Sequence, residues 1–195
     1  MYGLLNRALE NFLKERHGVP LWHRVTNRAQ SPFDGFEPLL TYEPALTDAL
    51  ISAACAELGR TRDSVLEDLG TALVSHRDRE GLRRLLRFGG VCYRDFLHSL
   101  EELPDRARLA LPHLHLPALV LHDQGAGRFT LMAAPYVDGA GYILMGLLRA
   151  MADDYGVLVV LDLGPPVAGV DVIDIHVLDE AFAEGRRFDL AAAAL

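Results

Sequence analysis

The hydrophobic pattern of the chain changes its period at Pro117, and this change constrains the fold more than any other feature. Before Pro117, apolar residues recur at helical spacing in segments that end at glycine or proline. After it, the pattern predicts two strands, a helix and two more strands, over residues 118–122, 128–134, 140–153, 157–163 and 171–178. About six helices followed by this mixed part indicate the α+β class.

Glycine, proline and capping residues divide the part of the chain before Pro117. Residues 30–45 contain several prolines and are expected to form a loop. Pro20 is expected to open the second helix, and Thr47 and Thr61 to cap the third and fourth. The predicted helices cover about residues 2–16, 20–29, 47–58, 61–74, 81–88 and 91–103.

The last of these helices has the most regular pattern. Phe96, Leu97, Leu100 and Leu103 lie at helical spacing and predict one buried face. Pro104 follows directly. It is expected to end the helix, because proline has no N–H to donate and its ring clashes with the preceding turn.

The composition indicates a single acidic globular domain. The chain has 195 residues, half of them hydrophobic, and a formal net charge of −8. Nucleic acid is not an expected partner, because the sequence has no basic stripe that would neutralise phosphates. Arg83, Arg84 and Arg87 do cluster, and at their helical spacing we interpret them as a solvated helix face.

Three further observations bear on the compartment. No apolar run approaches the roughly 18 residues that a membrane span requires. Arg7, Glu10 and Lys14 interrupt the N-terminal apolar pattern, so no signal peptide is expected. Cys55 and Cys92 are the only cysteines and form no C-x-x-C motif, which predicts reduced, buried thiols. We therefore expect a cytoplasmic protein that does not contact a membrane.

Several motifs together resemble the haem nitric oxide/oxygen binding (H-NOX) family. The chain opens with Met1-Tyr2-Gly3 followed by Asn6, Ala8 and Leu9. The run F-L-x-x-L-x-x-L spans Phe96 to Leu103 and is followed by Pro104, and a P-x-x-x-x-P motif comes later, from Pro112 to Pro117. The spacing of glycines also matches the family without a gap, at residues 70, 81, 90, 139 and 146.

The resemblance implies an N-terminal helical lobe packed on a four-stranded antiparallel sheet, with one helix between the strand pairs and haem between the lobes. It implies a single domain over residues 1–180, in which 1–60 form the distal helical part and 61–180 the proximal part with the sheet. Residues 181–195 are expected to form a weakly structured tail.

The same resemblance identifies the residues that would hold haem. In the family, a histidine after the last leucine of the F-L-x-x-L-x-x-L run ligates the iron, and a Tyr-x-Ser-x-Arg triplet holds the propionates. Pro104 occupies the position of that histidine. With the glycines at 139 and 146 as anchors, the triplet falls on Ala133, Pro135 and Val137. The haem that the resemblance implies would therefore lack its iron ligand and its propionate contacts.

The apolar pocket of the family is retained in the sequence. Apolar residues occupy its lining positions, namely Met1, Leu4, Leu5, Leu73, Pro117, Ile143 and Leu147, with Pro104 beside them. One interpretation is that an apolar ligand binds there without iron coordination. The other is that these side chains close on one another as ordinary core.

The resemblance implies a non-catalytic sensor that passes a binding event in its pocket to a separate signalling protein, such as a histidine kinase or a cyclic-dinucleotide enzyme. The alternative is a haem-binding NO or O2 sensor with a non-standard axial ligand or none. Catalysis is not expected, because the chain has no G-x-S-x-G, P-loop or H-E-x-x-H motif. Asp174 and His176 share a strand face, but no nucleophile is placed beside them. His113 and His115 lack a third ligand, so no metal site is predicted.

Overall fold

The computed structural model describes residues 2–75, 80–110 and 116–185. The helices are α1 (Tyr2–His17), α2 (Val19–Arg28), α3 (Pro44–Leu58), α4 (Arg62–Ser75), α5 (Glu80–Arg87), α6 (Tyr93–His98), the 3-10 helix η2 (Ser99–Glu102), α7 (Leu103–Ala110) and α8 (Ala140–Tyr155). The strands are β1 (Leu119–Gly125), β2 (Arg128–Ala133), β3 (Leu158–Leu163) and β4 (Asp171–Asp179). Among the described helices, none is long and apolar enough to cross a membrane.

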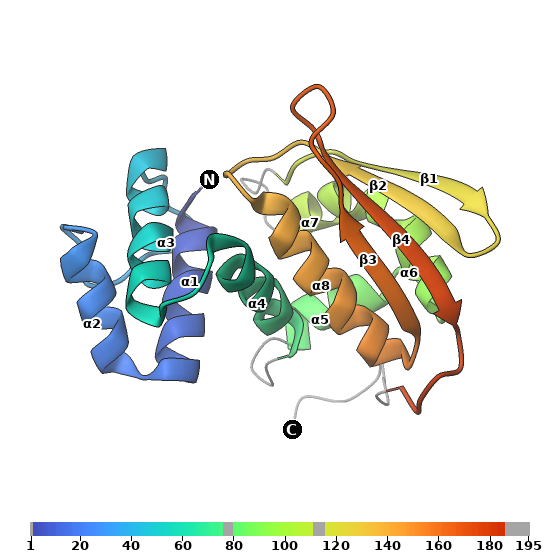
Figure 1. Ribbon diagram of the computed structural model, residues 1–195, viewed down its shortest axis with the longest axis horizontal. Coiled ribbons are helices and arrows are strands. Elements are labelled where there is room, and N and C mark those ends of the chain that lie inside the picture. Colours follow the sequence, from blue (N-terminus) through green and yellow to red (C-terminus); the bar gives the residue numbers. More distant parts are fainter. Residues whose placement is uncertain (1, 76–79, 111–115, 186–195) are drawn as a thin grey trace.

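The molecule has two lobes that α4 connects. Helices α1–α3 form the first lobe, and the sheet with α5–α8 forms the second (Figure 1). The four strands are antiparallel, in the order β1-β2-β4-β3. Helices α6, η2 and α8 share one hydrophobic core with the strand residues that face them. The predicted fold, a helical lobe on a four-stranded antiparallel sheet with one helix between the strand pairs, is confirmed.

Buried apolar side chains form two separate cores. The core of the helical lobe includes Leu9, Trp22 and Leu50, together with Val65, Leu66 and Leu69 of α4. The core of the sheet lobe is built from Phe96, Leu131, Leu148, Ile173 and their neighbours. A boundary between the two cores therefore runs along α4 and α8.

Two glycines bring the backbones of α4 and α8 into contact at this boundary. A Cβ on Gly70 would lie 2.0 Å from the carbonyl oxygen of Ile143, and one on Gly146 would lie 1.9 Å from that of Glu67. Neither position has room for any side chain. The hydroxyl of Thr71 also donates to the Gly146 carbonyl over 3.3 Å, so the helix crossing has a polar contact as well.

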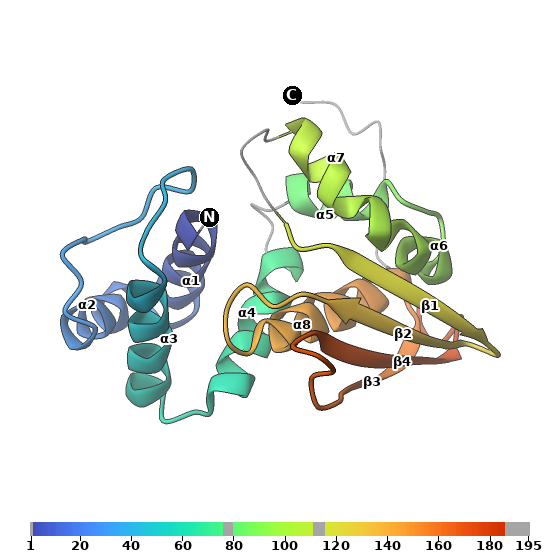
Figure 2. The same cartoon turned by 90° about the horizontal axis from the view of Figure 1, so that it is seen from above.

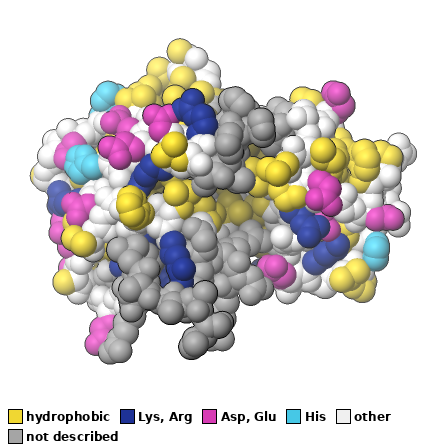
Figure 3. All heavy atoms as spheres, turned by 180° about the vertical axis from the view of Figure 1, so that it is seen from behind, with side chains coloured by type: hydrophobic (Ala, Val, Ile, Leu, Met, Phe, Trp, Pro, Cys, Tyr) yellow, Lys and Arg dark blue, Asp and Glu magenta, His cyan; other side chains and the backbone are white. Residues whose placement is uncertain are grey.

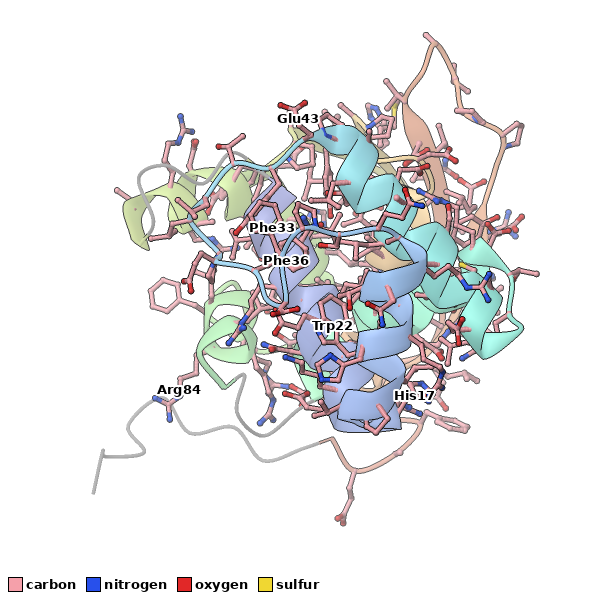
Figure 4. All side chains as sticks on the ribbon, turned by 90° about the vertical axis from the view of Figure 1, so that its left-hand side faces the viewer. His17, Trp22, Phe33, Phe36, Glu43 and Arg84 are labelled. Carbon is pink, nitrogen blue, oxygen red and sulfur yellow. The ribbon has the colours of Figure 1, made fainter. Side chains whose placement is uncertain are left out.

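An aromatic cluster fixes the long loop that follows α2 (Figure 4). The rings of Trp22 and Phe36 meet edge to face at 6.0 Å, and the indole Nε1–H of Trp22 donates to the Asp34 carbonyl over 3.0 Å. The buried carboxylate of Glu10 accepts the N–H of Phe36 over 2.9 Å and forms an ion pair of 2.6 Å with Lys14. These contacts hold the loop on α1 and α2.

The structure corrects two predicted helix boundaries. Helix α3 begins at Pro44, and the hydroxyl of Thr47 is buried and donates to Oδ1 of Asn6 over 2.8 Å instead of capping the helix. The predicted helix over residues 91–103 is wrong as one helix, because it divides into α6, η2 and the start of α7. Cys92 and Asp95 form a capping box at the start of α6, so the helix begins two residues later than predicted.

Candidate ligand site between the lobes

Pro104 lies in the first turn of α7 and not at the end of a continuous helix. Proline is tolerated there, because the N–H groups of the first turn have no acceptor within the helix. The preceding residues Ser99–Glu102 form a turn of 3-10 helix, which carries the chain from α6 into α7 without a break. Proline offers no side-chain nitrogen or sulfur, so position 104 cannot ligate a metal.

The three residues predicted at the positions of the propionate triplet lie in different surroundings. Ala133 ends β2 and is buried in the core of the sheet lobe. Pro135 is exposed, and Val137 packs against the core of the helical lobe. None of the three supplies a hydrogen-bond donor or a cation to a carboxylate.

The arginine that contacts this loop is already engaged. Nε of Arg62, at the start of α4, donates to the carbonyl of Asp138 over 3.2 Å. The same guanidinium lies 2.8 Å from the carboxylate of Asp48. Arg62 is thus paired with groups of the protein, although its buried Nη2 has no hydrogen-bond partner in the described structure.

Four of the predicted lining residues belong to the two cores or pack against them. Ile143 is buried in the core of the helical lobe, and Leu73 packs partly buried against that core, whereas Leu147 packs against the core of the sheet lobe. Leu4, Pro104 and Pro117 are also only partly buried, and Leu5 is buried in the helical lobe. Met1 lies outside the described residues. Figure 3 shows hydrophobic side chains in a recess between the lobes.

The pKa values of two tyrosine hydroxyls, one before α8 and one in its first turn, are raised. Burial raises the pKa of Tyr136, in the loop before α8, to about 12. Burial also raises the pKa of Tyr142, and a hydrogen bond with Asp63 of α4 acts in the same direction. Both hydroxyls therefore stay protonated at neutral pH and can donate hydrogen bonds without adding charge.

The described histidines lie on α1, α2, α6 and two strands of the sheet. His98 is exposed, and its Nε2 lies 3.3 Å from the carboxylate of Asp123, so it is engaged at the sheet surface. His122 and His176 lie on β1 and β4. Among the described residues, no three His, Cys, Asp or Glu side chains come together as a metal site requires. The predicted H-x-H pair at His113 and His115 lies outside the described residues.

The arginine cluster on α5 differs from its prediction. The guanidinium groups of Arg83 and Arg87 both bond to the buried carboxylate of Asp154 on α8, over 2.8 and 3.0 Å. Arg87 also lies over the ring of Tyr155, 3.9 Å from its centroid. The interpretation of the cluster as a solvated helix face is wrong for these two residues. The thiol prediction is also corrected, because both cysteines are free but Cys92 is exposed.

The fold and this inter-lobe boundary define the class of protein. The structure superimposes on the Fe(II) unliganded H-NOX protein from K. algicida with a TM-score of 0.79 and 15% identity, over 94% of this chain and 100% of the other. It also matches the H-NOX protein from S. oneidensis in the Fe(II)NO state, with a TM-score of 0.73 and 13% identity over 92% and 100% of the two chains. The architecture is that of H-NOX proteins.

The family model described as Haem-NO-binding matches residues 2–161, and the chain belongs to this family. Soluble guanylate cyclase 89Da of Drosophila melanogaster is 21% identical over 155 residues, which are 80% of this chain and 23% of that protein. Soluble guanylate cyclase gcy-31 of Caenorhabditis elegans is 23% identical over 154 residues, 79% of this chain and 22% of that protein. The chain thus spans about a quarter of the length of these curated relatives.

Proposed function

We propose that this chain is a non-catalytic sensor module of the haem-NO-binding type that no longer depends on haem. Its ligand would bind at the apolar boundary between the lobes. The observation that supports this proposal is that Pro104, Ala133, Pro135 and Val137 all occur together in this one chain. These four positions carry the polar contacts to haem in the family, and here none of them offers a donor to the iron or to a carboxylate.

The energetic deficit for haem is large. A charge-assisted hydrogen bond contributes about 1.5–3 kcal/mol, so the loss of the triplet removes several such contributions. The missing iron ligand removes a further stabilisation, because the protein holds haem iron through its axial side chain. Haem would then bind only through burial of its apolar surface.

The partial burial of the lining residues supports a ligand at the boundary. Leu4, Leu73, Leu147 and Pro117 are apolar, yet they are not fully buried, and the two cores on either side remain separate. Burial of a few hundred Å² of apolar ligand surface, at about 25 cal/mol per Å², would contribute several kcal/mol before the entropic costs of binding. An apolar ligand could thus bind without coordination to a metal.

The output of such a module would be contact with a signalling protein. The relatives found by sequence are soluble guanylate cyclases, in which the matching segment is a small part of a longer chain. We expect the partner of this chain to be a signalling enzyme, such as a histidine kinase or a cyclic-dinucleotide enzyme, whose activity changes when the two lobes move relative to each other.

A second candidate function is a haem-binding NO or O2 sensor with a non-standard axial ligand or none. The match to the haem-NO-binding family and the retained apolar lining favour it. The two candidates differ in colour. Protein is purified after expression with added haem precursor. If the chain does not bind haem, it should show no Soret band at about 400–430 nm, because only haem that the protein holds would co-purify. A stoichiometric Soret band would establish the second candidate.

A further inference from the structure

One face of the sheet carries outward side chains without a covering element. Helices α6, η2 and α8 cover the other face, and no described helix lies over this one (Figure 2). The alternation of the strands places a partly apolar set of side chains outward, among them Val120, Val160 and Leu178, which are 43%, 52% and 51% exposed. Val120 and Val160 lie on the two edge strands and Leu178 on a central strand, so the apolar side chains are spread across this face.

Strand register arranges the polar side chains of this face in two adjacent rows. The acidic row crosses the sheet through His122, Thr130, Asp174 and Asp162, which the register places opposite one another, and its two carboxylates lie side by side on β4 and β3. The hydroxyl of Thr130 donates to Oδ1 of Asp174 over 2.8 Å. The basic row lies two residues along each strand and contains Arg128 opposite His176.

The acidic row is unfavourable in an isolated chain. Like charges directly opposite each other on neighbouring strands destabilise a sheet. Within the described residues, no ion pair engages Asp162, Asp174 or Arg128. The face thus presents unpaired charges of both signs in adjacent rows.

Apolar residues lie at both ends of these rows. Val120, Met132 and Val172 form a row beyond the acidic one, since the register pairs Met132 with both of the others. Leu178 and Leu158 lie beyond the basic row. In order along the strands, the face is therefore apolar, acidic, basic and apolar.

We propose that this face binds a second copy of the same chain, with the two sheets stacked face to face about a two-fold axis that runs between the acidic and basic rows. Such an axis runs parallel to the rows and stacks each strand on the same strand of the other copy. It therefore brings Asp174 opposite His176, Thr130 opposite Arg128, and Val172 opposite Leu178. A two-fold interface must be self-complementary, and the order of the rows meets this condition. A purely basic or purely acidic partner would meet repulsion from one of the two rows.

The size of the face predicts a weak dimer. Strands about 4.8 Å apart with a rise of about 3.3 Å per residue give a projected area of about 400 Å² for four strands of this length. Standard stable interfaces bury about 800 Å² per partner. Self-association should therefore depend on concentration and be detectable at micromolar to millimolar protein.

Two charge reversals test the arrangement of the dimer. Asp174→Arg would face His176 of its partner, and His176→Asp would face Asp174 of its partner, so each variant alone should dimerise at least about tenfold more weakly than the wild type. An equimolar mixture of the two variants should restore association, because in the mixed dimer the arginine introduced at position 174 faces the aspartate introduced at position 176, and the remaining Asp174 faces the remaining His176. Glu37→Arg, an exposed charge reversal on the helical lobe, is the control and should leave association unchanged.

Sedimentation velocity over a concentration series measures the wild type, the three variants and the mixture, and circular dichroism checks that each variant is folded. The proposal requires a wild-type dimer, weakened single variants and a restored mixture. A wild type that stays monomeric up to millimolar concentration would overturn it and leave the face to a different protein. Folded single variants that dimerise as the wild type does would also overturn it, as would a mixture that fails to associate.

Discussion

The carboxylate of Asp171, at the start of β4, is partly buried and therefore incompletely solvated by water. One oxygen accepts a hydrogen bond from the backbone N–H of Gly141 in the first turn of α8, and Oδ2 is buried without a hydrogen-bond partner in the described structure. Burial raises the pKa of this carboxyl, the bond from Gly141 lowers it and the nearby Asp138 raises it further. The net direction is upward, because desolvation disfavours the charged form.

The raised pKa predicts a pH-dependent effect of Asp171→Asn. A carboxyl with a raised folded-state pKa binds its proton more tightly in the folded protein than in the unfolded chain. Its contribution to stability is therefore complete below the unfolded-state pKa of about 3.9. This contribution is lost as the pH rises through the folded-state pKa. Asparagine keeps an acceptor for Gly141 but never ionises. The free energy of unfolding of the variant, relative to the wild type, should therefore increase over this window. Urea unfolding at several pH values between about 3.5 and 7 measures it. A difference that does not change with pH would contradict the prediction.

At the scale of elements, Asp154 joins α5 to the rest of the sheet lobe. Its carboxylate is buried and bonds to the guanidinium groups of Arg83 and Arg87, which are themselves mostly buried. The hydroxyl of Tyr155 adds a bond to the Gly90 carbonyl over 2.9 Å, just beyond α5. Among the described side chains of α5, only Leu86 is fully buried in the core, so these polar contacts are a large part of what holds the helix.

Asp154→Asn should therefore destabilise the protein by about 3 kcal/mol, because removal of one partner of a buried ion pair leaves the other charges uncompensated. Asp153→Asn is a matched control on the neighbouring residue, whose side chain is exposed, and should change stability by less than about 0.5 kcal/mol. Chemical denaturation of both variants and the wild type measures the difference. Equal stability of the two variants would show that the contact between α5 and α8 does not depend on this ion pair.

At the scale of the whole molecule, the sequence predicts the order of elements well and the contacts between distant elements poorly. The alternating strands and the helix over 140–153 are readable because one period runs through each of them. The division of residues 91–103 into separate helices cannot be read from the sequence. Phe96, Leu97, Leu100 and Leu103 can share one face in a single α-helix or across a 3-10 turn. The bonds from Arg83 and Arg87 to Asp154 span about 70 residues of chain, and no local pattern encodes them.

The same limit applies to the candidate site. The assignment of Pro104, Ala133, Pro135 and Val137 to the haem-binding positions of the family rests on glycine anchors and leucine spacing, and it stays a prediction. The surroundings of these four residues in the fold cannot be read from the sequence. The expectation that Pro104 ends a helix fails for a related reason, because the proline lies in the first turn of a new helix, α7, where it is tolerated.

Titration with haem tests the central proposal most directly. The wild type is compared with Pro104→His, which returns a potential iron ligand, and with a quadruple variant that adds Ala133→Tyr, Pro135→Ser and Val137→Arg, which return propionate contacts. We predict negligible uptake by the wild type, weak uptake by the single variant and affinity higher by several kcal/mol in the quadruple variant, because each charge-assisted bond contributes about 1.5–3 kcal/mol. Ala133 is buried, so circular dichroism must first show that the quadruple variant folds. Stoichiometric, tight binding by the wild type would contradict the loss of haem, and a folded quadruple variant that takes up no haem would show that the boundary between the lobes has closed into core.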